Sequence, residues 1–209
     1  MGLFSGFFWR HHDLCLFHRT IDSEIRQRGA ALTRFIDENA PLPPEELRDE
    51  SFAIWQSRIE EAVFSHEAQT RSMESFSDQL LMVALWSMVE QFCGRALIET
   101  ERSKKCQQGL ESPHQWHLLV RRFKDLGADL DMGASYAAAN QCRVLNNKIK
   151  HVGRVDPELA AFSRFAGSLN ERLDDMQFDL QYYSDGVHEF VSWTFYTADN
   201  LIAGRPLDA

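Results

Sequence analysis

The stretch SFSDQLLMVALWSMVEQFCGRALIETER, residues 75–102, decides the fold class of this chain. It contains no proline, and its apolar side chains recur at the spacing expected along one face of an α-helix. A long helix with an apolar face needs other helices to cover that face. The stretch therefore predicts an all-α protein, and the positions that define its apolar face are Phe76, Leu80, Val83, Leu85, Met88, Phe92, Ala96 and Leu97.

Helical spacing continues on both sides of this stretch. Residues 10–38 carry a second apolar periodicity that stops at Asn39. A loop then leads into a helix with Pro44 in its first turn, where a missing N–H is tolerated. This helix either breaks near residues 69–72 or joins the stretch at residues 75–102, and the sequence leaves both alternatives open.

Capping signals delimit the helices in the rest of the chain. Asp156 followed by Pro157 supplies the cap and the first-turn proline of one helix, and residues 182–185 are expected to turn. Glycine ends the other three predicted helices. Gly127 ends the helix at residues 114–126, Gly153 ends the helix at residues 135–151, and Gly204 ends a last helix that reaches about residue 202.

The pattern as a whole predicts an up-down helical bundle with an N-terminal helical extension. We expect residues 1–70 to form a helical arm or hairpin and residues 71–209 to form the bundle, unless the two make one continuous domain. The hydrophobic fraction of 44% and the 15 phenylalanines are typical of a folded protein.

The cysteines and the apolar segments indicate a cytosolic protein. The four cysteines are scattered without a CxxC pair, which favours reduced thiols. No apolar run approaches the ~20 residues of a membrane-spanning helix, so no membrane partner is expected. The start MGLFSGFFWRHH has neither the basic stretch nor the cleavage pattern of a signal peptide. Its aromatic side chains (Phe4, Phe7, Phe8 and Trp9) would either dock on a partner or, as we expect, pack on the chain's own core.

The net charge of −9 is distributed unevenly. Residues 102–154 contain ten Lys or Arg against four acids, a local net charge of +6, whereas the remainder carries −15. Such segregation predicts a positive surface suited to nucleic acid on an otherwise acidic body. The alternative is that the basic residues are spread over separate faces.

The predicted helix at residues 135–151 carries the most concentrated polar pattern, RVLNNKIKHVG at residues 143–153. Arg143, Asn147 and His151 lie one turn apart and form a polar stripe with Lys150. The stripe is either a solvated face or a functional site, and a histidine in the last turn also complements the helix dipole. The buried face of this helix is expected at Ala138, Cys142, Leu145, Ile149 and Val152.

The motif Arg143-x3-Asn147-x2-Lys150-His151 resembles the motif helix of the HEPN superfamily (higher eukaryotes and prokaryotes nucleotide-binding domains). The segment WSMVEQFCGRAL, residues 86–97, resembles the HEPN helix that carries an acidic residue inside the bundle, which makes Glu90 its match. The resemblance covers about residues 75–204. Here Val144 follows Arg143 and seven residues separate Arg143 from His151, so the motif is similar to a longer-spaced bacterial variant.

The resemblance implies a small all-α, usually dimeric protein of a kind found in toxin–antitoxin and antiviral defence systems. Many members are metal-independent ribonucleases. RNA cleavage without a metal needs a base for the ribose 2′-OH and a cation for the phosphate, roles that suit His151 and Arg143. Asn147 would orient His151 or bind a phosphate oxygen. No cofactor and no metal are expected.

Geometry links this hypothesis to a dimer. Arg143 and His151 lie about 12 Å apart along an ideal helix, and an arginine side chain leans towards the helix N-terminus. One straight helix therefore does not bring both side chains to one phosphate. In a two-fold homodimer, Arg143 of one copy would meet His151 of the other.

Further candidates surround this motif. The side chains expected to contact RNA phosphates are Lys148, Lys150, Arg154, Arg121, Arg122 and Lys124. His11, Cys15 and His18 share a helical face but lack a matching fourth ligand, so we expect an aromatic and core role for them. The alternative function is a non-catalytic helical interaction or regulatory subunit of a defence complex, which would bind a protein partner through the acidic surface or the aromatic N-terminus.

Overall fold

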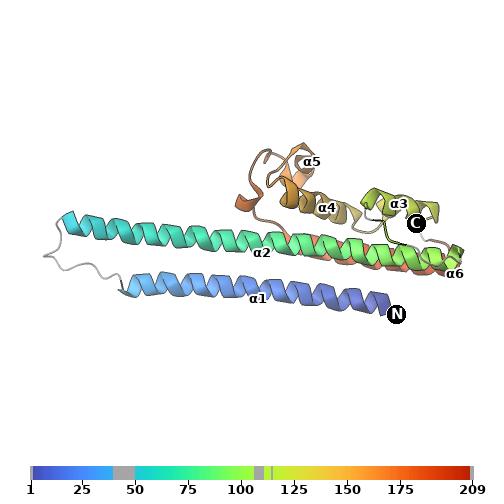
Figure 1. Ribbon diagram of the computed structural model, residues 1–209, viewed down its shortest axis with the longest axis horizontal. Coiled ribbons are helices and arrows are strands. Elements are labelled where there is room, and N and C mark those ends of the chain that lie inside the picture. Colours follow the sequence, from blue (N-terminus) through green and yellow to red (C-terminus); the bar gives the residue numbers. More distant parts are fainter. Residues whose placement is uncertain (1, 40–49, 106–110, 114, 208–209) are drawn as a thin grey trace. The chain divides into compact units, whose positions relative to one another are not determined.

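The computed structural model describes residues 2–39, 50–105, 111–113 and 115–207. These residues form an all-α helical bundle, and they contain no β-strand apart from one isolated bridge between Arg154 and Arg172. The predicted fold class is confirmed. Figure 1 shows the helices α1 (Gly2–Asn39), α2 (Glu50–Lys105), α3 (Trp116–Asp125), α4 (Tyr136–His151), α5 (Pro157–Ala160) and α6 (Leu180–Ala203), with the 3-10 turns η2 (Leu130–Met132), η3 (Ser163–Phe165) and η4 (Leu173–Asp175) between them.

The structure settles which predicted segments join and where they end. The alternative of a break near residues 69–72 is wrong, because α2 continues through them as one helix. The glycines expected after α3, α4 and α6 all adopt positive φ, namely 98° at Gly127, 68° at Gly153 and 67° at Gly204. The Pro44 prediction lies outside the described residues.

The turn expected at residues 182–185 is wrong. These residues lie in the first turns of α6, whose N-cap is Asp179, with its side chain accepting a hydrogen bond from the backbone N–H of Tyr182. The serine, aspartate and glycine at residues 184–186 suggested a turn, but Gly186 has a packing role. A Cβ at this position would lie 2.3 Å from the Cβ of Ala138, so glycine allows α6 to approach α4 closely.

The chain divides into two compact units. One comprises Met1–Cys15 with Gln79–Ala209, and the other comprises Leu16–Asp78. We call the first the bundle unit and the second the hairpin unit. Helices α1 and α2 each contribute residues to both.

The core of the bundle unit is formed by the C-terminal part of α2 together with α3, α4 and α6. Its largest fully buried side chains include Trp86, Phe123, Tyr183 and Phe190. Two thiols, Cys93 and Cys142, are buried in the same core, and burial raises the pKa of Cys93 to about 12 and raises that of Cys142 as well.

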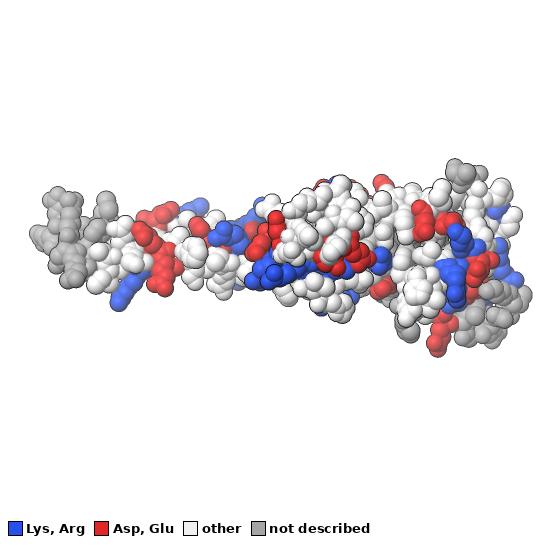
Figure 2. Space-filling model, turned by 90° about the horizontal axis from the view of Figure 1, so that it is seen from above, with Lys and Arg blue, Asp and Glu red and all other residues white. Residues whose placement is uncertain are grey.

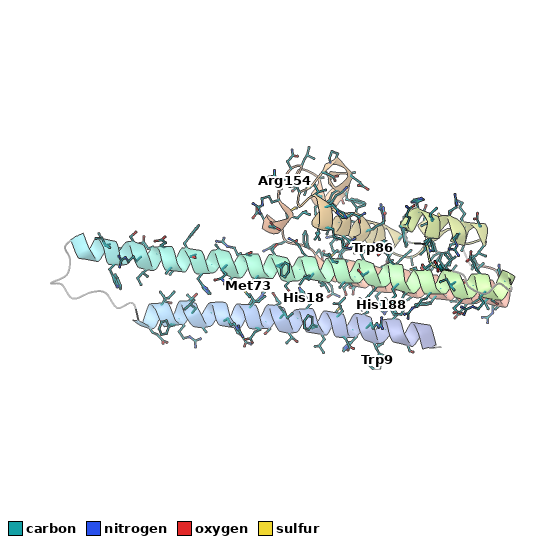
Figure 3. All side chains as sticks on the ribbon, viewed as in Figure 1. Trp9, His18, Met73, Trp86, Arg154 and His188 are labelled. Carbon is teal, nitrogen blue, oxygen red and sulfur yellow. The ribbon has the colours of Figure 1, made fainter. Side chains whose placement is uncertain are left out.

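The N-terminal aromatic residues divide between core and surface. Phe7 is fully buried, with its ring centroid 5.3 Å from that of Phe92 and 6.4 Å from that of Phe195. Phe8 and Trp9 are exposed, and Trp9 points away from α2 in Figure 3. The expectation that this segment packs on the chain's own core is thus confirmed for Phe7, and the side chain of Phe4 lies outside the description.

One described helix is long and apolar enough to cross a membrane by length and composition. It is the part of α2 between Ala53 and Lys104, where a window reaches a mean hydropathy of 1.3. Within that window 56% is buried inside the structure, and the core helix of a soluble protein passes the same test. The finding is therefore weak support for a membrane span.

Candidate nucleic-acid interface

Helix α4 positions the predicted motif by burying its opposite side in the core of the bundle unit. Ala138, Cys142 and Leu145 are buried as predicted, and Ile149 is partly buried. Val152 is half exposed, contrary to the prediction. It is the C-cap residue with φ −121°, so its side chain no longer follows the helical phase.

The end of α4 is built by a glycine cap. The backbone N–H groups of Val152 and Gly153 both donate to the carbonyl of Lys148, over 2.9 and 2.8 Å. Gly153 adopts φ 68°, which glycine accepts without the steric cost that other residues meet. The chain then turns into α5, where the Asp156 side chain caps the N–H of Leu159 at 3.0 Å.

A polar stripe runs along α4 through Tyr136, Asn140, Arg143, Asn147 and Lys150, at spacings of four, three, four and three residues. Arg143 is held in it by a hydrogen bond from its Nε to Oδ1 of Asn140 over 3.0 Å. Burial, followed by a hydrogen bond with Asp131, raises the pKa of Tyr136 to about 12, so this phenol stays neutral. Arg143 is thus oriented towards the N-terminal half of the helix.

Lys148, predicted to contact RNA, is neutralised within the chain. Its ammonium lies 2.8 Å from Asp156 and 2.5 Å from Glu158. Burial alone would lower the pKa of Lys148, but the hydrogen bonds to both carboxylates outweigh this effect and raise it. Glu158 also lies 3.9 Å from Nη2 of Arg143. The ammonium of Lys148 is therefore engaged within the chain, contrary to the expected RNA contact.

The remaining polar residues at this end are exposed. They are Asn147, Lys150, His151 and Arg154. Lys150, His151 and Arg154 form no ion pair with another described residue. Asn147 accepts a hydrogen bond from Nδ2 of Asn146 over 3.3 Å. Lys150, His151 and Arg154 are therefore exposed polar groups at the end of α4 where Asn147 also lies.

Arg143 and His151 are not brought together. Both belong to the one helix α4, eight residues and about 12 Å apart at 1.5 Å per residue. The arginine is engaged by Asn140 and Glu158. A single copy of the chain therefore does not present these two side chains to one phosphate.

Asn146 was missed by the sequence reasoning. Its side chain is only 2% exposed, and its Oδ1 has no hydrogen-bond partner among the described residues. The signal was present, because Asn146 follows Cys142 by four residues and falls on the apolar face of α4. A buried amide that donates to Asn147 holds that neighbour in place.

The prediction that Glu90 lies inside the bundle is wrong, and the buried acid among the described residues is Glu101. Glu90 is exposed, whereas Glu101 is 2% exposed and is bound by Arg122. Nε of Arg122 donates to Oε1 of Glu101 over 3.1 Å, Nη2 donates to Oε2, and Nη1 donates to the carbonyl of Glu111 over 2.9 Å. The guanidinium of Arg122 is therefore engaged within the fold, contrary to the expected RNA contact.

The other basic residues of α3 do not extend the α4 surface. Lys124 forms an ion pair with Asp129 at 2.8 Å, and Arg121 is exposed. Figure 1 places α3 beyond the N-terminal end of α4, away from the C-terminal end of that helix. Blue side chains in Figure 2 accordingly form separate groups over α3 and over α4–α5, each beside red ones. On the face that Figure 2 shows, the basic side chains therefore form smaller, partly neutralised groups, which favours the alternative that they are spread over separate faces.

A second polar cluster joins the N-terminal segment to α6 within the bundle unit. Nε2 of His11 lies 3.0 Å from the carbonyl oxygen of Ser184 and 3.1 Å from its hydroxyl. The hydroxyl also lies 3.2 Å from Sγ of Cys15, and the rings of His11 and His188 have centroids 5.2 Å apart. Burial lowers the pKa of both histidines, and the charge of His11 lowers that of His188 further.

This cluster predicts that acid loosens the bundle unit. A histidine whose pKa is lowered on folding stabilises the fold above its unfolded pKa of about 6.5 and loses this contribution as the pH falls towards the folded value. Asp185 and Glu189 oppose the shift but do not reverse it. We expect the Tm to fall by a few degrees on acidification through this window.

The measurement is thermal unfolding across pH, comparing wild type with the double variant His11→Gln/His188→Gln. Glutamine keeps a hydrogen-bonding side chain but does not titrate, so the variant should show a flatter pH profile. Parallel profiles would contradict the prediction.

No metal site is formed by the candidates. Among the described residues, no three His, Cys, Asp or Glu side chains are grouped so as to hold a metal ion. His11 is engaged by Ser184, and Nε2 of His18 lies 2.9 Å from Oδ1 of Asp78.

Comparisons of the chain with protein-family models, curated proteins and solved structures gave no match.

Proposed function

We propose that this chain binds RNA at the C-terminal end of α4, and that two copies together cleave it without a metal ion, as the HEPN resemblance implies. The observation that carries the proposal is the exposed set Lys150, His151 and Arg154, which lack ion-pair partners among the described residues. Lys150 and His151 lie in the last turn of α4, and Arg154 directly follows the glycine cap that ends this helix.

The chemistry suits a phosphodiester. Lys150 and Arg154 supply positive charge for the phosphate backbone, and His151 is the residue type that takes or gives a proton near neutral pH. Asn147, held by Asn146, offers its side-chain amide to a phosphate oxygen or to His151. Arg143 supplies the guanidinium that stabilises charge on the phosphate in the transition state.

A complete site needs Arg143 from one copy and His151 from the other, because one helix holds them about 12 Å apart. In the partner arrangement, Arg143 exchanges its long 3.9 Å contact with Glu158 for a phosphate, to which it binds more strongly through its bidentate fork. The role of the dimer is therefore to complete the site.

Removing the proposed base should abolish cleavage. His151→Ala is expected to lower the cleavage rate by about 10²–10⁴-fold while leaving the fold intact, because an exposed side chain is removed. The measurement is cleavage of labelled single-stranded RNA in EDTA. The matched control is His12→Ala, another exposed histidine. Equal cleavage by wild type and His151→Ala would refute the enzymatic role.

Mixing two inactive variants tests whether the site is shared. Arg143→Ala and His151→Ala should each be inactive alone. Random exchange makes half of the dimers mixed, and each mixed dimer has one complete site of two, so about a quarter of wild-type activity should return. A mixture as inactive as its components would refute the shared site.

The second candidate function is a non-catalytic interaction module. The observation that favours it is the engagement of Arg143 by Asn140 and Glu158, which keeps Arg143 away from His151 in the same copy. RNA binding that depends on Lys150 and Arg154, with no cleavage in any variant, would select an RNA-binding module. Absence of both activities would select a protein-binding module.

A further inference from the structure

The carboxylate of Glu158 lies between two cations of α4. Its Oε2 is 2.5 Å from Nζ of Lys148, and its Oε1 is 3.9 Å from Nη2 of Arg143. The carboxylate therefore bridges the two side chains. Arginine binds carboxylates and phosphates through the same guanidinium donors. Glu158 thus occupies Arg143 in the way that a phosphate of RNA would.

The two bridged cations lie on either side of Asn147 on the surface of α4. Arg143 and Lys148 are five residues apart, which is about 7.5 Å along the helix and about 140° around it. Asn147 lies about 40° from Arg143 on the same arc. A carboxylate that contacts both cations therefore lies over the turn of α4 that carries two residues of the proposed site.

Lys148 already has a first carboxylate partner besides Glu158. Oδ2 of Asp156 lies 2.8 Å from Nζ of Lys148, while Oδ1 of Asp156 accepts a hydrogen bond from the backbone N–H of Leu159. Asp156 therefore balances the charge of Lys148 and caps α5 at the same time. Glu158 is the additional carboxylate, and the cation that it balances is Arg143.

The side chain of Glu158 can leave Arg143 without moving α5. Glu158 is 54% exposed, whereas the next residue, Leu159, is fully buried and anchors α5 in the core of the bundle unit. A long, partly exposed ion pair shifts an equilibrium by a factor of about five or less. The contact with Arg143 is therefore weak enough for a ligand to replace it.

From these contacts we infer that Glu158 is an internal competitor of the substrate, which closes Arg143 in the free chain and is displaced by a phosphate of RNA. The inference rests on the proposed function, because it assigns a regulating group to that site. In this arrangement Lys148 holds the carboxylate beside Arg143 and does not itself contact RNA.

A competitor of this kind selects for polyanions. Glu158 is attached to the chain, so its effective concentration at Arg143 is high and an isolated small anion competes with it poorly. RNA carries further phosphates that contact Lys150 and Arg154, and these contacts favour displacement of the carboxylate. Glu158 therefore lowers the affinity for inorganic phosphate by a factor that a polynucleotide overcomes.

The test is the RNA affinity of Glu158→Gln, measured by fluorescence anisotropy in EDTA. The probe is a labelled single-stranded RNA with methylated 2′-OH groups, which is bound but not cleaved. Glutamine keeps the size of the side chain and removes its charge, so Arg143 is open. We expect the Kd to fall by about fivefold. The plot of log affinity against log salt should steepen by about 0.7, since one more counterion is released.

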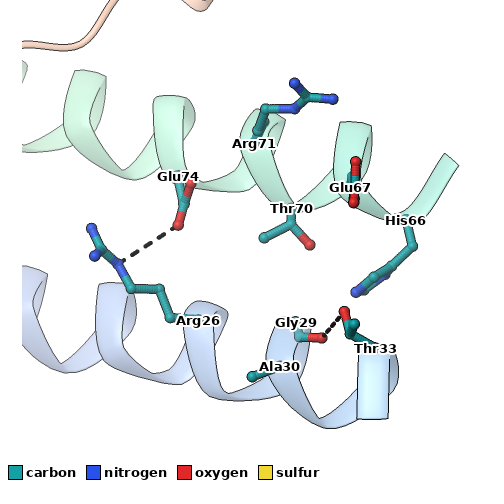
Figure 4. A pocket seen from close by; sticks show the side chains of 9 residues that line it. All are labelled: Arg26, Gly29, Ala30, Thr33, His66, Glu67, Thr70, Arg71 and Glu74. Carbon is teal, nitrogen blue, oxygen red and sulfur yellow. Dashed lines mark hydrogen bonds and ion pairs between the residues drawn. The ribbon is translucent and has the colours of Figure 1, made fainter. Parts of the chain in front are cut away.

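Glu74→Gln is the matched control. Figure 4 shows Glu74 in a contact of the same kind, 3.7 Å from Nε of Arg26, beside a cavity of about 390 Å³ in the hairpin unit. Nε of Arg26 also lies 3.2 Å from Asp22, so this arginine stays engaged in the variant. The control changes the net charge equally but lies outside the proposed site. Its Kd should stay within about twofold of the wild-type value, because distant charges are screened.

A double variant shows whether Glu158 acts through Arg143. In the Arg143→Ala background, adding Glu158→Gln should change the Kd by less than about twofold, because the group that Glu158 closes is gone. Equal tightening with and without Arg143 would reveal a general charge effect and overturn the inference. An RNA affinity of Glu158→Gln that equals or falls below that of wild type would overturn it as well.

A measurement without RNA separates this inference from the proposed function. The Nε–Hε NMR signal of Arg143, identified by its loss in Arg143→Ala, is followed as inorganic phosphate is added. It should respond at about fivefold lower phosphate in Glu158→Gln than in wild type. If no variant binds RNA, the proposed function fails, while this difference still shows that Glu158 closes Arg143. Identical phosphate titrations would show that Glu158 does not close Arg143.

Discussion

Arg122→Ala is expected to lower the free energy of unfolding by roughly 3–5 kcal/mol, the cost of removing the guanidinium that binds a buried carboxylate. The carboxylate is that of Glu101, which is 2% exposed and is bound by two nitrogens of the guanidinium. The same guanidinium donates to the carbonyl of Glu111, so a third contact is lost with it. The measurement is urea unfolding, with the midpoint compared at constant m-value.

Two variants separate loss of the pair from loss of an arginine. Arg121→Ala removes the exposed neighbour and should change stability by less than about 0.5 kcal/mol. Glu101→Leu/Arg122→Met removes both charges and should recover most of the lost stability, because an apolar pair has no unmet charge. Equal losses for Arg121→Ala and Arg122→Ala would show that the ion pair is not buried as described.

Gly186→Ala is expected to destabilise the protein by roughly 1–3 kcal/mol, although alanine favours a helix more than glycine does. The added methyl group would lie 2.3 Å from the Cβ of Ala138, where α6 crosses α4. Neither group can rotate away, because both are attached directly to helix backbone. The helices must therefore separate, and the packing around them is lost.

The reciprocal change should restore stability. In Gly186→Ala/Ala138→Gly the methyl group moves from one helix to the other, so the clash disappears and the helix propensities cancel. We expect a coupling energy of at least about 1 kcal/mol between the two sites in a double-mutant cycle. Ala137→Gly, at the exposed neighbouring position, is the control and should not rescue Gly186→Ala.

Much of the fold could be predicted because helix periodicity and caps are local signals. The continuous apolar pattern placed residues 75–102 in one helix, and the glycines at 127, 153 and 204 marked helix ends correctly. Gly186 wrongly indicates a turn, because its role is to allow the close tertiary contact with Ala138. A residue that serves a partner helix cannot be distinguished from a turn residue by local sequence.

The acidic residue of the bundle shows the same limit. Glu90 and Glu101 are eleven residues apart, so they lie on nearly the same face of α2. Glu101 is buried because Arg122 of α3 covers that end of the helix, while Glu90 is exposed. Helical phase alone treats the two positions alike, and the placement of α3 decides between them.

The net charge of residues 102–154 overstates the positive surface for a related reason. The basic segment was bounded at residues 102 and 154, which left out three acids just beyond its ends. Glu101 binds Arg122, and Asp156 and Glu158 bind Lys148. With these three acids included, the net charge of the segment falls from +6 to +3. Whether a basic side chain is neutralised depends on which acidic side chains contact it in the folded chain.

The two thiols buried in the core of the bundle unit report when this core opens, because a reagent in solution reaches them only then. Alkylating reagents attack the thiolate. In the folded state Cys93 and Cys142 are buried, and their raised pKa keeps both thiols protonated. Cys93 of α2 is hydrogen-bonded with Thr194 of α6, and Sγ of Cys142 on α4 lies 3.9 Å from the Met82 carbonyl of α2, so modification of each requires a different pair of helices to part. The order in which the two sites gain mass therefore distinguishes fraying of one helix from concerted unfolding of the whole core.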